Sequence, residues 1–364
     1  MQVTIHGIGI VGAFGSGIDA FSEALARKER CTKSVVVQSS SGQKEMPFYR
    51  TDTTRLNEFI PRTNLRRVDH YARMGLLAAS LALKDSGEVK IRRSRLGIVV
   101  ATGYGASATT SAFLDSFINE GDTFPSPTHF SNSVHNAAAA HISIFLKASG
   151  PCLTVSQFEL SLASALLTAM TWLEERRVDF VLLGSVDECC DILSYCWWRF
   201  FGEWSKFQVE PFRFGRQSAI PGEGSAFFLL SSPKRNEGAY CNIVDVQTGN
   251  MKSEKPSLSE KGLLIVSADG HKQCGKSYRE FLGKSTRTVS FTPVYGSFPT
   301  NNAFDMAAAA LILKRGGTFL PPYAAPQPVI SRSKEPLPYE DIDLVQCLKI
   351  GMERDFGFIT LCRT

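Results

Sequence analysis

Hydrophobic and polar positions form two recurring patterns along the chain. Short apolar runs rich in β-branched residues predict buried strands, and longer segments with apolar residues three or four positions apart predict helices with one buried face. Strands are expected over 96–101, 153–155 and 178–183, and helices over 69–86, 108–118 and 160–170. Because strand and helix segments alternate, the pattern predicts an α/β protein with largely parallel sheets covered by helices.

The segment GPCLTVSQFELSLASALLTAM, residues 150–170, combines a β-prone run with a helix of small residues. The turn between them presents one side chain at a helix N-terminus, where unpaired backbone N–H groups favour an anion. That side chain is Glu159, a weak nucleophile that the helix end would hold in its anionic form. Two interpretations stay open: an active-site geometry without its chemistry, or an ordinary carboxylate at a helix N-terminus.

Residues 288–316 repeat the order of strand, turn and small-residue helix seen in residues 150–170. Such internal similarity predicts a duplicated α/β unit. A largely polar stretch from about residue 236 to 256 separates the two copies. We therefore expect two halves, residues 1–235 and a shortened second half, residues 236–364.

The opening sequence VTIHGIGIVGAFGSG places Gly7, Gly9 and Gly12 in the G-x-G-x-x-G spacing of dinucleotide sites. That motif needs a second strand ending in Asp or Glu, whereas the next apolar run, residues 35–37, ends in Gln38. A strand followed by a glycine-rich turn is the preferred interpretation, and we expect no nucleotide cofactor.

Composition narrows the class of protein. The 364 residues are 43% hydrophobic and 21% charged, as in soluble globular proteins. We find no charged-then-apolar leader and no run of 18 uncharged apolar residues, so we expect a cytoplasmic protein that does not insert into membranes. The nine cysteines are odd in number and lack C-x-x-C spacing, which argues against a disulfide framework or a metal site.

The formal net charge of +5 suits an acidic partner. A local basic cluster contains Arg62, Arg66, Arg67 and Arg73, without interleaved aromatic residues or a nucleic-acid-binding module. The sequence therefore argues against nucleic-acid binding and favours an acidic carrier protein.

Aromatic residues gather in one further stretch, at Trp197, Trp198, Phe200, Phe201 and Trp204. Rings at such spacing more often pack a core or a lid than stack on a ligand. We interpret this aromatic cluster as packing, with ligand stacking as the alternative.

Four stretches in order resemble the β-ketoacyl synthases of the thiolase superfamily: GIGIVGAFGSG, GPCLTV, VDFVLLGSVDE and PFRFGRQSAIPGEGSAFFLL. The last contains the Gly-Glu-Gly segment at Gly222, Glu223 and Gly224. The resemblance implies a five-layer αβαβα fold built from two related halves. It also implies a dimer in which the strand of Leu153, Thr154 and Val155 pairs across the two-fold axis.

Family members that catalyse condensation use a cysteine at the turn before the helix and two histidines from the second half. The resemblance places Glu159 at the cysteine position, Asp269 at the first histidine and Phe304 at the second. His271 lies close to the first position and is its alternative occupant. The terminal glycine-rich loop of the family corresponds to KIGMERDFGF, residues 349–358, where two glycines are replaced by a Glu-Arg pair.

These replacements remove the groups that condensation needs. A thiolate holds the acyl chain, and imidazole or backbone N–H donors stabilise the enolate and the oxyanion. Glu159 and Asp269 would repel the developing negative charge, and Phe304 can donate nothing. The resemblance therefore implies a subunit that is not catalytic by itself.

Within the family, the chain resembles chain-length factors of aryl-polyene and type II polyketide systems. This implies a heterodimer, or a higher oligomer, with an active ketosynthase, and an acyl carrier protein as a second partner. The helix over 108–118 would wall the acyl tunnel through Phe113 and Phe117, and Arg66 and Arg67 would open a helix at the carrier-docking face.

Two enzymatic alternatives stay open. The first is decarboxylation of a malonyl carrier for priming, which the anionic Glu159 disfavours because a carboxylate cannot donate to an enolate. The second is residual condensation through Cys152, which lies at the start of the strand, away from the turn, and is expected to pack in the interior.

Overall fold

The computed structural model describes residues 2–39, 42–87, 89–121, 125–201, 208–233, 238–259, 262–282, 287–316, 319, 323–324 and 341–364. The strands are β1 (Val3–Gly12), β2 (Gly15–Ser16), β3 (Lys33–Ser39), β4 (Gly42–Phe48), β5 (Leu96–Thr102), β6 (Cys152–Ser156), β7 (Phe180–Asp187), β8 (Gly224–Ser231), β9 (Cys241–Asn250), β10 (Leu263–Val266), β11 (Thr288–Ser290), β12 (Tyr323–Ala324), β13 (Leu344–Ile350) and β14 (Asp355–Cys362). The α-helices are α1 (Ile18–Arg27), α2 (His70–Asp85), α3 (Ser107–Glu120), α4 (Pro127–Asn132), α5 (Ala137–Leu146), α6 (Ser161–Glu174), α7 (Asp191–Phe201), α8 (Lys272–Leu282), α9 (Thr292–Tyr295) and α10 (Asn302–Arg315). Short 3₁₀ helices are η1 (Thr54–Glu58), η2 (Arg62–Leu65), η3 (Arg93–Arg95) and η4 (Phe158–Leu160).

The two halves of the chain repeat one strand topology. The first half has the spatial order β6-β5-β7-β8-β1, and the second has β11-β10-β13-β14-β9. In both, the first three strands are parallel and the last two are antiparallel to their neighbours. The halves join through the antiparallel pair β1 and β9. The predicted α/β fold from two related halves is confirmed.

Helices cover the sheet halves in five layers. α6 and α10 pack between the two halves, and their apolar side chains share one core cluster with inward residues of both halves. α2 and α5 cover the outer face of the first half, and α8 covers the outer face of the second. α6 follows β6 and α10 follows β11, so the repeat seen in the sequence joins topologically equivalent elements.

Alternation along strand β5 explains how it is buried on both faces. On β5, Val99 and Ala101 point into the central core, whereas Ile98 and Val100 pack beneath α2. Successive side chains of a strand point to opposite faces, so a continuous apolar run fits a strand between two helical layers.

The glycine pattern of β1 serves close packing against a helix. A Cβ built on Gly9 would lie 1.9 Å from the carbonyl oxygen of Ala78 on α2, and one on Gly7 would lie 2.3 Å from that of Ala82. The side chain of Asp69 caps α2 by accepting from the Ala72 N–H at 2.9 Å. As predicted, β1 is followed by a turn that contains glycine, and β2 after this turn pairs with β1.

The predicted helices and strands are present, with boundaries that shift by a few residues at most sites. β7 differs most, because it runs on through the small and polar residues Gly184, Ser185 and Asp187, which are buried and paired with β8. The expected boundary at residues 235 and 236 falls within residues 234–237, outside those described, between the end of β8 and the start of β9.

The aromatic cluster divides between core and surface. Trp197 is buried and packs with Val37 and Met46 of the β3–β4 hairpin, whereas Phe200 is 80% exposed. Trp204 lies outside the described residues. None of the helices that the structure describes has both the length and the apolar character needed to cross a bilayer.

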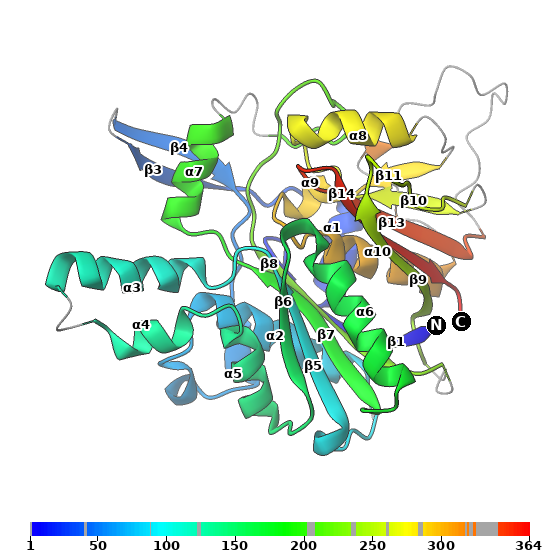
Figure 1. Ribbon diagram of the computed structural model, residues 1–364, viewed down its shortest axis with the longest axis horizontal. Coiled ribbons are helices and arrows are strands. Elements are labelled where there is room, and N and C mark those ends of the chain that lie inside the picture. The colour runs from blue at the N-terminus through cyan, green and yellow to red at the C-terminus, as the bar shows by residue number, and fades with distance from the viewer. Residues whose placement is uncertain are drawn as a thin grey trace.

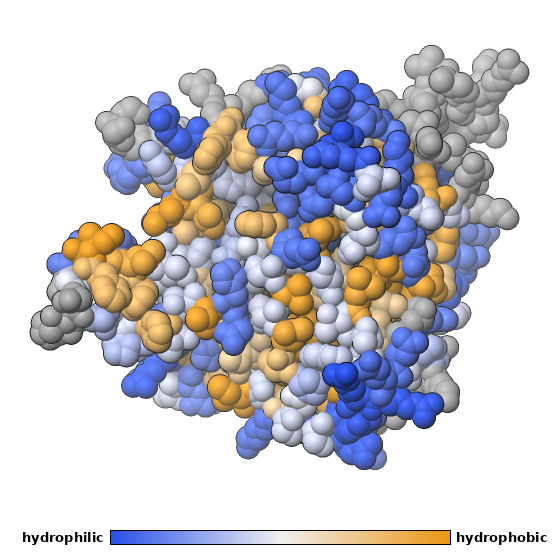
Figure 2. Space-filling model, viewed as in Figure 1, coloured by the Kyte–Doolittle hydropathy of each residue, from blue (hydrophilic) through white to orange (hydrophobic). Residues whose placement is uncertain are grey.

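A helical hairpin of α3 and α4 projects from one side of the body (Figure 1). Figure 2 shows hydrophobic side chains gathered at its outer end. Those exposed on it include Leu114, Phe117, Ile118 and Phe130. The outer end of the hairpin therefore presents apolar side chains to solvent in the single chain.

Candidate functional site

Glu159 lies where β6 turns into α6. Phe158, directly before it, has a φ of 46°, a left-handed backbone conformation that a bulky side chain rarely adopts. The hydroxyl of Ser161 fixes the turn by accepting from the Gln157 N–H at 2.8 Å and donating to the Thr102 carbonyl at 2.9 Å. The turn is therefore strained and tightly held, as at a nucleophile elbow, but it presents a half-buried carboxylate.

A buried ion pair lies in the second half, between β13 and the segment after β10. The ammonium of Lys349 donates to Asp269 Oδ2 and to Asn301 Oδ1, each at 3.0 Å, and the hydroxyl of Ser297 donates to Asp269 Oδ2 at 2.6 Å. Sequence reasoning missed Lys349. Its signal was a lysine inside the apolar run LVQCLKI, where a buried cation needs a partner.

The charges of Glu159, Asp269 and Lys349 interact. Burial raises the pKa of Glu159, and the nearby Lys349 opposes that rise. Burial would also raise the pKa of Asp269, but Lys349, His271 and the Ser297 hydroxyl bring it down to about 2. Burial therefore opposes the charged form of Glu159, and Lys349 is the first of the groups that favour it; the expectation that the helix end holds this carboxylate anionic stays a prediction.

His271, two residues after Asp269, packs its ring against aromatic side chains. Its ring centroid is 4.9 Å from that of Trp197 and 4.7 Å from that of Phe201, and its Nδ1 lies 3.3 Å from Gln217 Nε2. Burial lowers the pKa of His271, which favours the neutral imidazole. The side chain that contacts Lys349 is that of Asp269, so the structure brings Asp269 rather than His271 into the charged group.

Phe304 is buried in an aromatic core on α10. Its ring packs against Phe14, Phe21, Tyr295 and Phe298, with centroid separations between 5.0 and 6.2 Å. The residue of this segment that reaches Lys349 is Asn301, three positions earlier. The assignment of Phe304 to the second histidine position stays a prediction.

The terminal loop forms a tight connection between β13 and β14. Arg354 takes the left-handed conformation, with a φ of 71°, in which glycine is ordinarily found. Its N–H donates to the Gly351 carbonyl at 3.1 Å, and its guanidinium lies 2.8 Å from Glu280. A glycine-like backbone is thus kept while a bulky cation replaces the glycine.

The Gly-Glu-Gly segment has a structural role. Glu223 Oε1 accepts from the N–H and the hydroxyl of Thr51, both at 3.0 Å, and lies 2.9 Å from His70 Nε2. Burial would raise the pKa of Glu223, but His70 and Arg50 lower it. A Cβ on Gly224 would lie 2.7 Å from Phe304 Cζ, so a side chain there would clash.

Strand β6 is one of the two edge strands of the large sheet among the described strands, and β12 is the other. Leu153 on it is 41% exposed, and Thr154 and Val155 are half-buried. Cys152 is exposed, which corrects the expectation that it packs in the interior. Burial of its sulfur nevertheless raises the pKa of Cys152, so it is poorly suited as a thiolate nucleophile.

Phe113 and Phe117 pack within the hairpin. Phe113 lies with its centroid 5.1 Å from Phe117 and 5.4 Å from Phe130 of α4, and the Phe117 ring is partly exposed. Arg66 and Arg67 are exposed in the turn between η2 and α2, so the expectation that they open a helix is wrong. The helix opens only after the cap Asp69, and the Arg67 carbonyl is held by the Asn132 amide at 2.8 Å.

Residues 1–236 match the family described as Beta-ketoacyl synthase, N-terminal domain. The Streptomyces cyaneus protein named "Putative polyketide beta-ketoacyl synthase 1" is 24% identical over 285 residues. The match covers 73% of this chain and 68% of that protein. The solved structure titled "The ishigamide ketosynthase/chain length factor" superposes with a TM-score of 0.79 at 17% identity, covering 100% of this chain and 99% of that one. A type II PKS acyl-carrier protein in complex with its ketosynthase, AntDE:AntF, gives 0.78 at 16% identity over 100% and 99%.

These matches define the class of protein as thiolase-like, in agreement with the five layers and the duplicated topology. The chain belongs to the β-ketoacyl synthase family.

Proposed function

We propose that this chain is a non-catalytic chain-length-factor subunit, which forms a cytoplasmic heterodimer with an active β-ketoacyl synthase and shapes its acyl tunnel. One observation carries the proposal: the elbow keeps its strained geometry but presents Glu159, next to a buried Asp269–Lys349 pair. A carboxylate cannot form the acyl thioester, and Lys349 gives two of its three N–H donors to Asp269 and Asn301, while the Asp269 carboxylate compensates its charge.

The surface of the chain supports a partner subunit. Among the described strands, none pairs with the outer edge of β6, where Leu153 is exposed, and the α3–α4 hairpin projects with apolar side chains toward its tip. Exposed edges and apolar patches are costly unless another chain covers them. Among the structural neighbours, one title names a ketosynthase/chain length factor and another a carrier protein bound to its ketosynthase.

Decarboxylation of a malonyl carrier is the second candidate, because Lys349 brings a cation close to Glu159. Two of the three N–H donors of its ammonium are bonded to Asp269 and Asn301, and the Asp269 carboxylate beside it would repel an enolate. We rank this activity below the non-catalytic role for that reason.

The test is reconstitution with a ketosynthase encoded beside this chain. We expect a complex of the two chains by mass measurement, and condensation of acyl and malonyl carriers only when the ketosynthase is present. Glu159→Cys in this chain should not create condensation, because the imidazole donors are still missing.

Two outcomes would contradict the proposal. Elongation by the purified single chain, or by its Glu159→Cys variant, at a rate near that of an ordinary ketosynthase would show a working site. Release of CO₂ from a malonyl carrier by the single chain, abolished by Lys349→Met, would favour the decarboxylase instead.

A further inference from the structure

The N-terminal end of α3, called its root below, is held by carboxylates from other elements. Asp187, fully buried at the end of β7, accepts through Oδ1 from the hydroxyl of Thr102 at 2.9 Å and from the N–H groups of Gly103 and Tyr104 at 2.8 Å. Its Oδ2 accepts from the N–H and the hydroxyl of Thr300, at 3.1 and 2.8 Å. One side chain thus joins the loop that leads into α3 to the segment before α10.

Glu188, the residue after Asp187, takes the place of the side-chain cap that α3 lacks. Ala106, at the N-cap position, has no side chain that can bond to the first turn. Glu188 instead accepts from the Ala108 N–H at 2.8 Å, and Asp69 accepts from the Thr109 hydroxyl at 2.7 Å. Both carboxylates face the positive end of the helix, where an anion is stabilising.

Beyond this root, α3 lies mainly beside α4 and α7 and becomes exposed toward its end. Thr110 donates its hydroxyl to the Ser133 carbonyl at 2.9 Å, which ties α4 to the same first turn. Because α3 is fixed at its N-terminal end, a small change of direction there displaces the residues at its outer end most.

We propose that Asp187 and Glu188, with Asp69, are positioning residues that set the direction in which α3 projects, and thereby the product length of the complex. The second part rests on the proposed function, whereas the first part is a property of this chain alone. The pair lies at the end of VDFVLLGSVDE, one of the four stretches that carry the family resemblance.

The hydrogen bond from the Ala108 N–H to Glu188, which is the anchor of α3, is sensitive to pH because of the groups around Glu188. Burial raises the pKa of Glu188 to about 7, opposed by the Ala108 N–H, while Asp69 and Glu223 raise it and His70 lowers it. If Ala108 detaches while Glu188 stays buried, the carboxyl loses the hydrogen bond that favours its charged form. Attachment of α3 should therefore strengthen as the pH rises through about 7.

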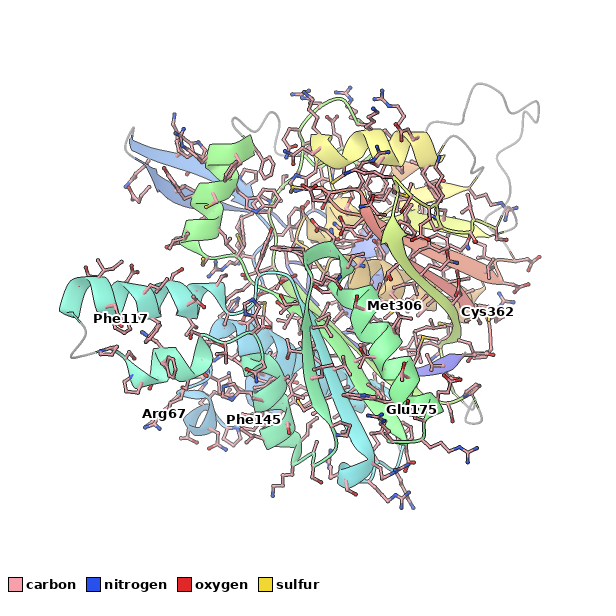
Figure 3. All side chains as sticks on the ribbon, viewed as in Figure 1. Arg67, Phe117, Phe145, Glu175, Met306 and Cys362 are labelled. Atoms are coloured by element: carbon pink, nitrogen blue, oxygen red, sulfur yellow. The ribbon has the colours of Figure 1, made fainter. Side chains whose placement is uncertain are left out.

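The experiment measures hydrogen exchange over residues 105–113 in the purified chain, corrected for intrinsic rates, and product length in the reconstituted complex. Glu188→Ala should speed exchange of the first turn by about tenfold, as for loss of a helix cap, and Glu188→Gln by about threefold, because only the charge is lost. Thr109→Val should loosen the same turn independently. Glu175→Gln, on an exposed residue far from the hairpin in Figure 3, is the matched control.

The wild type should exchange more slowly at pH 8 than at pH 6, and Glu188→Gln should lose this dependence. In the complex, the Glu188 variants should alter the product distribution at unchanged yield of heterodimer. Unchanged exchange in all three variants would overturn the anchor. Faster exchange with an unchanged product distribution would overturn the link between the attachment of α3 and chain length. Failure of the wild-type complex to assemble would refute the proposed function, and hydrogen exchange in the single chain would still test the attachment of α3.

Discussion

At the scale of single residues, a buried ion pair lies beside Glu159. Asp269 and Lys349 are each almost fully buried, and their atoms lie 3.0 Å apart. Such a pair stabilises only while both members are present, because either one alone is an uncompensated charge in a low-dielectric interior. The pair therefore holds β13 against the segment of Ser297 and Asn301, at the place where the resemblance expects catalytic donors.

We expect Lys349→Met to lower the free energy of unfolding by about 3 to 5 kcal/mol, because Asp269 is left buried without its partner. The measurement is a urea unfolding curve at pH 7. Since the pKa of Asp269 is lowered to about 2, its charge contributes stability above the ordinary Asp pKa near 4, and this contribution is lost as the pH falls through 2.

Lys276→Met, on an exposed residue of α8, is the control and should change stability by less than about 1 kcal/mol. The double variant Lys349→Met with Asp269→Asn should recover part of the loss. A single variant as stable as the wild type would show that the pair does not hold the site together.

The sequence located Glu159 and Asp269 through their spacing to neighbouring motifs, and both lie near one cation. Lys349 could not be found in this way, because the partner of a buried charge comes from a strand 80 residues away along the chain. The anchoring of α3 by Glu188 was missed for the same reason, since a helix cap is ordinarily sought in the residues next to the helix.

At the scale of elements, the edge strand β6 carries the dimer prediction. Leu153→Lys places a charge on the exposed edge, which should block pairing of β6 with a second chain while β5 still holds the strand. We expect the heterodimer to dissociate, measured by analytical ultracentrifugation. Val36→Lys, on a similarly exposed position of β3, should leave assembly unchanged, and an intact complex in both variants would place the interface elsewhere.

The hairpin carries the prediction about product length. Phe113→Ala removes the central ring of the trio with Phe117 and Phe130, so space opens for additional carbons at the tunnel end. Because Phe113 is only half-buried, its loss should cost less than the roughly 3 to 5 kcal/mol of a buried phenylalanine. We expect a folded heterodimer with longer products, measured by mass spectrometry. An active complex with unchanged products for both Phe113→Ala and Phe117→Ala would show that this helix does not set product length.

Local sequence predicted the elements well because their burial is regular. Strand β5 is apolar on both faces and α2 has its own cap, so both are visible from pattern alone. β7 extends beyond its apolar run because its polar end is bonded to distant residues, above all through Asp187. Local patterns cannot show such pairing.

At the scale of the whole molecule, duplication explains why the site lies where it does. Each half places a helix of small residues, α6 or α10, into the central layer, so the starts of both helices approach the same region from opposite halves of the sheet. Thr300 and Asn301, before α10, bond to Asp187 of the first half and Lys349 of the second. The interface between the halves is therefore held by bonds from this short segment to both halves, which suits the proposed role of a subunit kept for its shape.

The charge of the whole molecule leads to the last prediction, that Arg66 and Arg67 attract an acidic acyl carrier protein. Both side chains are exposed beside α4, and Figure 3 shows Arg67 at the surface below the hairpin. Arg66→Glu with Arg67→Glu should weaken carrier binding to the complex at low salt, with the difference shrinking as added salt screens the charges, measured by titration calorimetry. Lys90→Glu with Arg93→Glu changes the net charge equally at exposed positions elsewhere and is the control. Equal loss in both double variants would mean that overall charge rather than this site attracts the carrier, and no loss in either would remove these arginines from the docking face.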